Sequence, residues 1–139
     1  MFSAAKLRRA PGRLTAGALI LHSGRQKLAG DAAFAQGVHG LFCATYPAFK
    51  PVPPAVLLKA LAVIEITVGS VLLLPLVGAR LSGLLLTGYS LTLLGMYVRT
   101  PGLHDERLLP TLAGTPFAKD AWLTAIGASL VLDRATSKK

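Results

Sequence analysis

Glu65 is the residue whose type and position point most directly to chemistry, because it is the only acidic residue between Pro54 and Val98. It follows Pro54 by eleven residues, which is about 16 Å along a helix. A carboxylate at that depth in a membrane costs at least about 2.5 kcal/mol, so it needs a partner, a proton or a function. Glu65 is therefore predicted either to carry protons or to hydrogen-bond a bound head group. The alternative is a structural ion pair or hydrogen bond between helices.

Basic partners for Glu65 are expected on the first helix. At about 100° per residue, Arg13 and Lys27 share one face with two glycines, whereas His22 and Arg25 fall on another face. Small residues beside two cations suit close packing against an acidic neighbour. The sequence does not decide whether Lys27, Arg25 or His22 is the partner. The predicted intramembrane polar centre consists of Glu65, Lys27, His22, Arg25 and Arg13.

Long apolar runs must position these residues. Residues 54–77 carry only Lys59 and Glu65 as charges, and residues 81–98 carry none. About 20 apolar residues span the roughly 30 Å hydrocarbon core of a bilayer. A chain of 139 residues cannot bury two helices that are apolar on every side. The sequence therefore predicts an all-α, single-domain (residues 1–139) integral membrane four-helix bundle, with helices over 12–28, 54–77, 79–99 and 116–132.

Two segments are ambiguous. Residues 12–28 have a short apolar core, so a signal peptide competes with a retained helix. Arg25 and Lys27 occupy the place of a cleavage site, which favours retention. Residues 32–46 are apolar but too short to span, and they are interrupted by polar residues and glycines. They are expected to form an interfacial or a re-entrant helix, and the sequence leaves this choice open.

Small residues recur where membrane helices pack closely. Gly17, Gly24, Gly69 and Gly83 are the glycines expected at helix contacts. Two stripes of small residues are expected to face neighbouring helices. They are Ala79, Gly83, Thr87 and Ser90 on the third helix, and Ala121, Ala125, Ala128 and Ser129 on the fourth.

The net charge of +9 does not indicate a nucleic-acid partner, because the basic residues form no stripe interleaved with aromatics. They flank apolar segments, where Lys and Arg contact lipid phosphates and determine topology. Their density near the spans predicts that both termini are cytoplasmic. The basic residues assigned to that side are Lys6, Arg8, Arg9, Arg13, Arg80, Arg134, Lys138 and Lys139.

Cofactor ligands are sparse. Cys43 is the only cysteine, which excludes an internal disulfide and a cysteine-held iron–sulfur cluster. It is predicted to be a small buried apolar residue without a catalytic role. The three histidines, His22, His39 and His104, lie in different segments, so neither a haem nor a zinc site is predicted.

The motifs RLTAG at 13–17 and LHSGRQKLAG at 21–30 resemble the first helix of the DoxX family. Glu65 followed by Gly69, and GARLSG at 78–83, resemble the family's second helix and the turn after it. The resemblance extends over about residues 13–132, although the segment 31–53 is longer than in a minimal member. It implies a multi-pass protein of the bacterial plasma membrane, linked to quinone-dependent redox reactions or to oxidative-stress complexes.

The leading functional hypothesis is a small membrane subunit of a redox complex, which binds or adjoins a quinone and is not catalytic on its own. The expected partners are membrane lipid and either a protein of that complex or further copies of the chain. Two alternatives remain. One is a structural or interaction protein of the membrane without chemistry of its own, and the other is an oligomeric transporter of a small solute.

Overall fold

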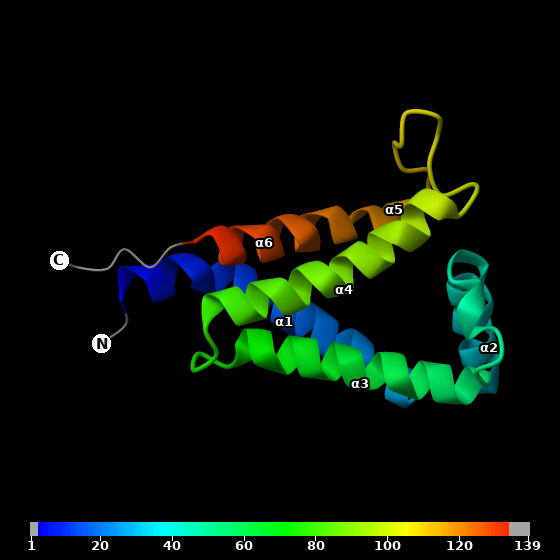
Figure 1. The fold of residues 1–139 in the computed structure, drawn as a ribbon, viewed down its shortest axis with the longest axis horizontal. Coiled ribbons are helices and arrows are strands. Elements are labelled where there is room, and N and C mark those ends of the chain that lie inside the picture. Colours follow the sequence, from blue (N-terminus) through cyan, green and yellow to red (C-terminus); the bar gives the residue numbers. More distant parts are fainter. Residues whose placement is uncertain (1–2, 134–139) are drawn as a thin grey trace.

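The computed structural model describes residues 3–133, and this part of the chain is all-helical, as predicted. Arg134, Lys138 and Lys139, which entered the topology prediction, lie outside the described residues. Figure 1 labels the helices. Their bounds are α1 (Ala4–Leu28), α2 (Ala32–Thr45), the 3₁₀ turn η1 (Pro47–Phe49), α3 (Pro54–Leu73), α4 (Ala79–Arg99), α5 (Thr115–Ala118) and α6 (Asp120–Leu132).

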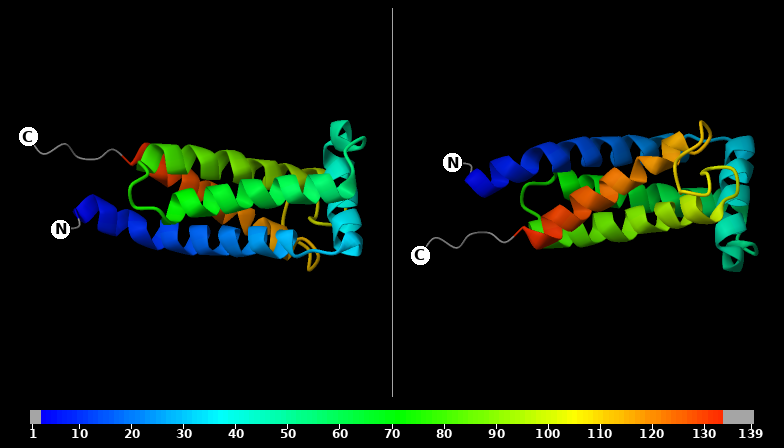
Figure 2. Two further views of the ribbon diagram at one scale, coloured as in Figure 1. Left: turned by 90° about the horizontal axis from the view of Figure 1, so that it is seen from below. Right: turned by 90° about the horizontal axis from the view of Figure 1, so that it is seen from above.

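The long helices form two closely packed pairs, α1 with α3 and α4 with α6. All four run along the long axis of the molecule, and α2 lies across one end of them (Figures 1 and 2). The start of α1, the turn between α3 and α4, and the end of α6 lie together at the opposite end. The molecule therefore has two distinct ends.

Three predicted boundaries are wrong. The first helix begins at Ala4, about two turns before the predicted start, and contains Pro11 in its interior. Ser3 is its N-cap, and the Ser3 hydroxyl accepts a hydrogen bond from the Lys6 amide. The second predicted helix, over 54–77, ends at Leu73, since Pro75 disfavours helical geometry at the residue before it. The segment predicted as one helix over 116–132 is divided at Lys119 into α5 and α6.

The helices α3 and α4 are each long and apolar enough to cross a membrane, by length and composition. Of their most apolar stretches, 39% and 33% are buried inside the protein. Large apolar side chains are therefore exposed on both helices. They include Val56, Val63, Ile64, Leu81, Leu84, Leu91 and Val98.

Glycines set the spacing of both helix pairs. A Cβ atom on Gly69 would lie 2.7 Å from the Leu21 amide nitrogen and 2.9 Å from the Gly17 carbonyl oxygen. A Cβ atom on Gly83 would lie 2.7 Å from the carbonyl oxygen of Gly127. The predicted contacts at these glycines are thus confirmed, and so is the buried stripe on α4. The predicted stripe on α6 is wrong, since Ala121 and Ala125 are exposed and Gly127 makes the contact.

We expect Gly69→Ala to separate α1 from α3, because the atoms that a new methyl group meets belong to the backbone and cannot rotate away. Overpacking of this kind costs about 1–3 kcal/mol. Gly88→Ala is the matched control, since a Cβ atom there meets nothing within 4 Å. Thermal unfolding in detergent should show a lower midpoint for Gly69→Ala and an unchanged or higher one for Gly88→Ala. Equal midpoints would contradict the close approach of the two helices.

Candidate functional site

Glu65 lies at the centre of a buried polar cluster formed by α1, α3 and α4. Its carboxylate forms an ion pair with Lys27, whose Nζ lies 2.9 Å from Oε1 and 3.0 Å from Oε2. It also accepts a hydrogen bond at Oε1 from the Tyr89 hydroxyl, at 2.8 Å. The residue is 3% exposed. Lys27 also donates to the Ser23 hydroxyl at 2.9 Å. We call Lys27, Glu65 and Tyr89 the polar cluster.

Lys27 reaches Glu65 because of the helix packing. Gly24 lies against α3, where a Cβ atom would be 3.0 Å from both the Ala62 carbonyl oxygen and the Glu65 Cβ atom. Side chains on a helix lean toward its N-terminus. The Lys27 ammonium therefore extends back beside Ser23, to the depth of Glu65. Of the partners considered from the sequence, the structure places Lys27 against the carboxylate.

Tyr89 was missed by sequence reasoning, although a signal for it exists. Glu65 and Tyr89 are each twelve residues from Val77, which lies in the turn between α3 and α4. In an antiparallel pair of helices, positions equidistant from the turn lie at the same depth. The hydrogen bond between these two side chains follows from that symmetry.

Asp120, also missed, is the second buried acid of the site. It is 3% exposed at the start of α6. The next turn of α6 is fixed to α4, since the Thr124 hydroxyl lies 2.9 Å from the Ser90 hydroxyl. The interior therefore holds the acid, lysine and phenol of the polar cluster and, at the start of the helix that packs on α4, a second acid.

The other predicted members lie elsewhere. His22 and Arg25 are exposed on the other face of α1. Arg13 binds the end of α3: its guanidinium donates to the carbonyl oxygens of Leu72 (2.8 Å), Val71 (3.0 Å), Leu74 (2.7 Å) and Val77 (3.0 Å). Val71 and Leu72 lie in the last turn of α3, where carbonyl oxygens have no partner within the helix. Leu74 and Val77 lie in the turn that follows, and the Leu74 carbonyl oxygen also accepts from the Val77 amide. Arg13 therefore holds the helix end and the turn instead of pairing with Glu65.

No group of three potential metal ligands occurs within residues 3–133. Both ring nitrogens of His104 lie within 2.9 Å of a carbonyl oxygen, from Asp105 and from Val98. These hydrogen bonds raise the pKa of the His104 imidazole. Cys43 is buried beside Phe42, Leu57 and Met96.

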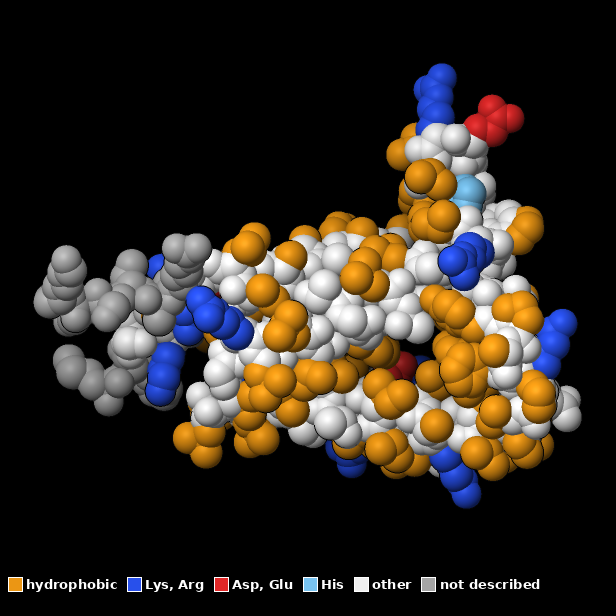
Figure 3. Space-filling model, viewed as in Figure 1, with side chains coloured by type: hydrophobic (Ala, Val, Ile, Leu, Met, Phe, Trp, Pro, Cys, Tyr) orange, Lys and Arg blue, Asp and Glu red, His pale blue; other side chains and the backbone are white. Residues whose placement is uncertain are grey.

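The surface of the molecule is hollowed between α3 and α4, next to α2 (Figure 3). Parts of an acidic and a basic side chain are visible at the bottom of this hollow, which is bordered by hydrophobic side chains. An opening of this kind gives an apolar molecule access to charged groups in the interior. The arrangement can hold a carbonyl or hydroxyl group and exchange a proton with it.

Comparison with known proteins gives no relative: no family model, no curated protein sequence and no solved structure matches this chain.

Proposed function

We propose that the protein is an integral membrane four-helix bundle of the DoxX type, and that it serves as the membrane subunit of a redox complex. In this proposal α1, α3, α4 and α6 cross the bacterial plasma membrane, and α2 lies at the interface. The polar cluster receives the head group of a quinone. Electrons come from a partner protein, and the cluster handles the accompanying protons.

The membrane location is supported by the surface of the long helices. Of the apolar stretches of α3 and α4, 39% and 33% are buried inside the protein, and large apolar side chains are exposed along both helices. Exposed apolar surface of this kind marks contacts with a membrane or with another protein. In a membrane these apolar side chains contact lipid instead of water. Trp122 is 75% exposed near one end of α6, where tryptophan is enriched at membrane interfaces.

The two ends of the molecule support an orientation with both termini in the cytoplasm. Lys6, Arg8 and Arg9 lie at one end together with Arg80, and an excess of Lys and Arg favours the cytoplasmic side. A cytoplasmic reporter fused after Lys139 is therefore expected to be active. A periplasm-dependent reporter should be active when inserted between α4 and α5, for example after Glu106, and inactive after Lys139. Activity of the periplasmic reporter after Lys139 would reverse the topology.

The single observation that carries the redox proposal is the polar cluster at the depth of the hollow. A buried ion pair that only joined two helices would need Lys27 and Glu65 alone. Here a phenol hydroxyl is added to the pair, and Asp120 is a second buried acid in the same bundle. Reduction of a quinone takes up protons together with electrons, and protonated carboxyl groups and phenols are suitable donors for its oxygens. The DoxX-like motifs, in their order along the chain, support the same proposal of a membrane subunit of a redox complex.

Purification of the full chain in mild detergent tests the proposal. We expect a redox protein to co-purify with the parent, together with quinone in the extracted lipid. Glu65→Gln should keep the partner and lose the quinone, whereas Lys59→Gln, an exposed cation on the same helix, should keep both. An oligomer without partner or quinone, which moves a solute in liposomes, would replace this proposal with that of a transporter.

A further inference from the structure

A second cavity lies away from the polar cluster, at the end of the molecule where the chain begins. Its volume is about 640 Å³, and it lies between the first turns of α1 and the turn that joins α3 to α4. On α1 it extends from Lys6 to Leu14, about 12 Å at the rise of a helix. On the other side it is lined by the end of α3 and by residues 75–79.

The lining is divided into an apolar and a basic part. Leu7 and Leu14 contribute from α1, and Leu73 and Leu76 from the other side. Leu7, Leu14 and Leu76 are 64%, 54% and 92% exposed, so they form an open apolar surface and not a core. The basic part consists of Lys6, Arg9 and Arg13, and within residues 3–133 the cavity has no acidic residue in its lining.

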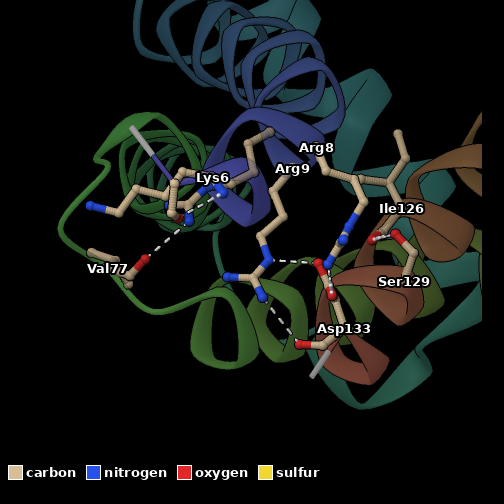
Figure 4. A network of polar contacts seen from close by, with 9 residues as sticks. Lys6, Arg8, Arg9, Val77, Ile126, Ser129 and Asp133 are labelled. Carbon is tan, nitrogen blue, oxygen red and sulfur yellow. Dashed lines mark hydrogen bonds and ion pairs between the residues drawn. The ribbon is translucent and has the colours of Figure 1, made fainter. Parts of the chain in front are cut away.

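The positive charge is only partly compensated. Asp133 is bound by Arg8 and by Arg9, whose Nε lies 2.6 Å from the carboxylate (Figure 4). These two hydrogen bonds lower the pKa of the Asp133 carboxyl, so it stays ionised and compensates one of the two arginines. The guanidinium of Arg13 compensates the negative end of the α3 dipole. Lys6 adds a further cation at the same rim.

We propose that this cavity binds one anionic phospholipid. Its phosphate lies against Lys6 and Arg9, and one acyl chain follows Leu7, Leu14 and Leu76. The occupant needs an anionic group and an apolar chain that extends along α1, and it enters from the bilayer. A volume of about 640 Å³ is within the usual range of about 300–1,000 Å³ for ligand cavities. This inference rests on the membrane location proposed above, and it is independent of the redox role.

Native mass spectrometry of the full chain in neutral detergent tests the site. We expect phosphatidylglycerol to bind more tightly than phosphatidylcholine with the same acyl chains. Lys6→Gln should weaken phosphatidylglycerol binding about fivefold, which corresponds to one basic residue near an anionic lipid. Arg80→Gln removes an exposed cation outside the cavity lining and should change nothing. Ala10→Phe fills the cavity and should weaken binding of both lipids without any change of charge.

Three results would overturn the proposal: equal affinity for the two lipids, equal losses in Lys6→Gln and Arg80→Gln, or complete competition by inorganic phosphate. The second would indicate diffuse attraction, and the third a site for an anion alone. Carbonate extraction of membranes tests separately whether the chain is inserted in the membrane at all. A chain that washes out of membranes contradicts both proposals, whereas an inserted chain without lipid preference contradicts only this one.

Discussion

Glu65→Ala is expected to have the largest effect of any single substitution, because it leaves the Lys27 ammonium unpaired in an apolar interior. Loss of one member of a buried ion pair costs about 3–5 kcal/mol. The variant should give a low yield of folded protein in detergent, measured by size-exclusion chromatography and thermal unfolding. Glu106→Ala, which removes an exposed acid in a loop, is the control and should match the parent.

Two further variants separate the roles of Glu65. Glu65→Gln keeps an acceptor for Lys27 and Tyr89, so it should fold, yet it cannot carry a proton. If Glu65→Gln folds but has lost the redox function, the result supports a proton-carrying role for Glu65. If it keeps full function, the role of Glu65 is purely structural. The double variant Lys27→Met/Glu65→Leu should recover stability relative to Glu65→Ala, since no unpaired charge remains. A Glu65→Leu single variant that folds and functions like the parent would contradict both roles.

Arg13→Met is expected to have the second-largest effect, since four carbonyl oxygens at the end of α3 and in the turn after it lose the guanidinium together. Each hydrogen bond to a charged group contributes about 1.5–3 kcal/mol, and exposure of part of this site reduces the sum. We expect a destabilisation of about 3 kcal/mol. Hydrogen exchange of the amides in residues 72–82 should increase most.

Arg25→Met is the matched control for Arg13→Met, because Arg25 is an exposed arginine on the same helix. It should leave both stability and exchange unchanged. Arg13→Lys supplies fewer donors in a different geometry and should fall between the two. Exchange in residues 72–82 that does not respond to Arg13→Met would show that the turn is held by other contacts.

The helices and the two closest helix contacts could be predicted from the sequence, because apolar run length and small residues are local signals. The burial of Glu65 follows from the same reasoning, since an acid in the middle of an apolar helix has few alternatives. The position of Gly17 and Gly24 on one face also indicated where α3 packs. These features depend on a single helix or on the spacing within it.

The rest of the site depends on how helices far apart in the sequence are placed. Arg13 shares a face with Lys27, but it lies at the other end of that face, beside carbonyl oxygens that are exposed because α3 ends at Leu73. Asp120 follows a loop, and nothing local indicates that it turns inward. Its burial requires α6 to pack on α4, at a register set by Gly83 and Gly127.

Photolabelling with an azido-quinone in proteoliposomes tests the central claim most directly, which is that the polar cluster receives a quinone head group within the membrane. We predict that the label is found on peptides of α3 and α4 around Glu65 and Tyr89, that unlabelled quinone competes with it, and that Glu65→Gln reduces it. The Lys59→Gln variant should be labelled like the parent. Labelling that is confined to other segments, or that unlabelled quinone does not reduce, would contradict the claim.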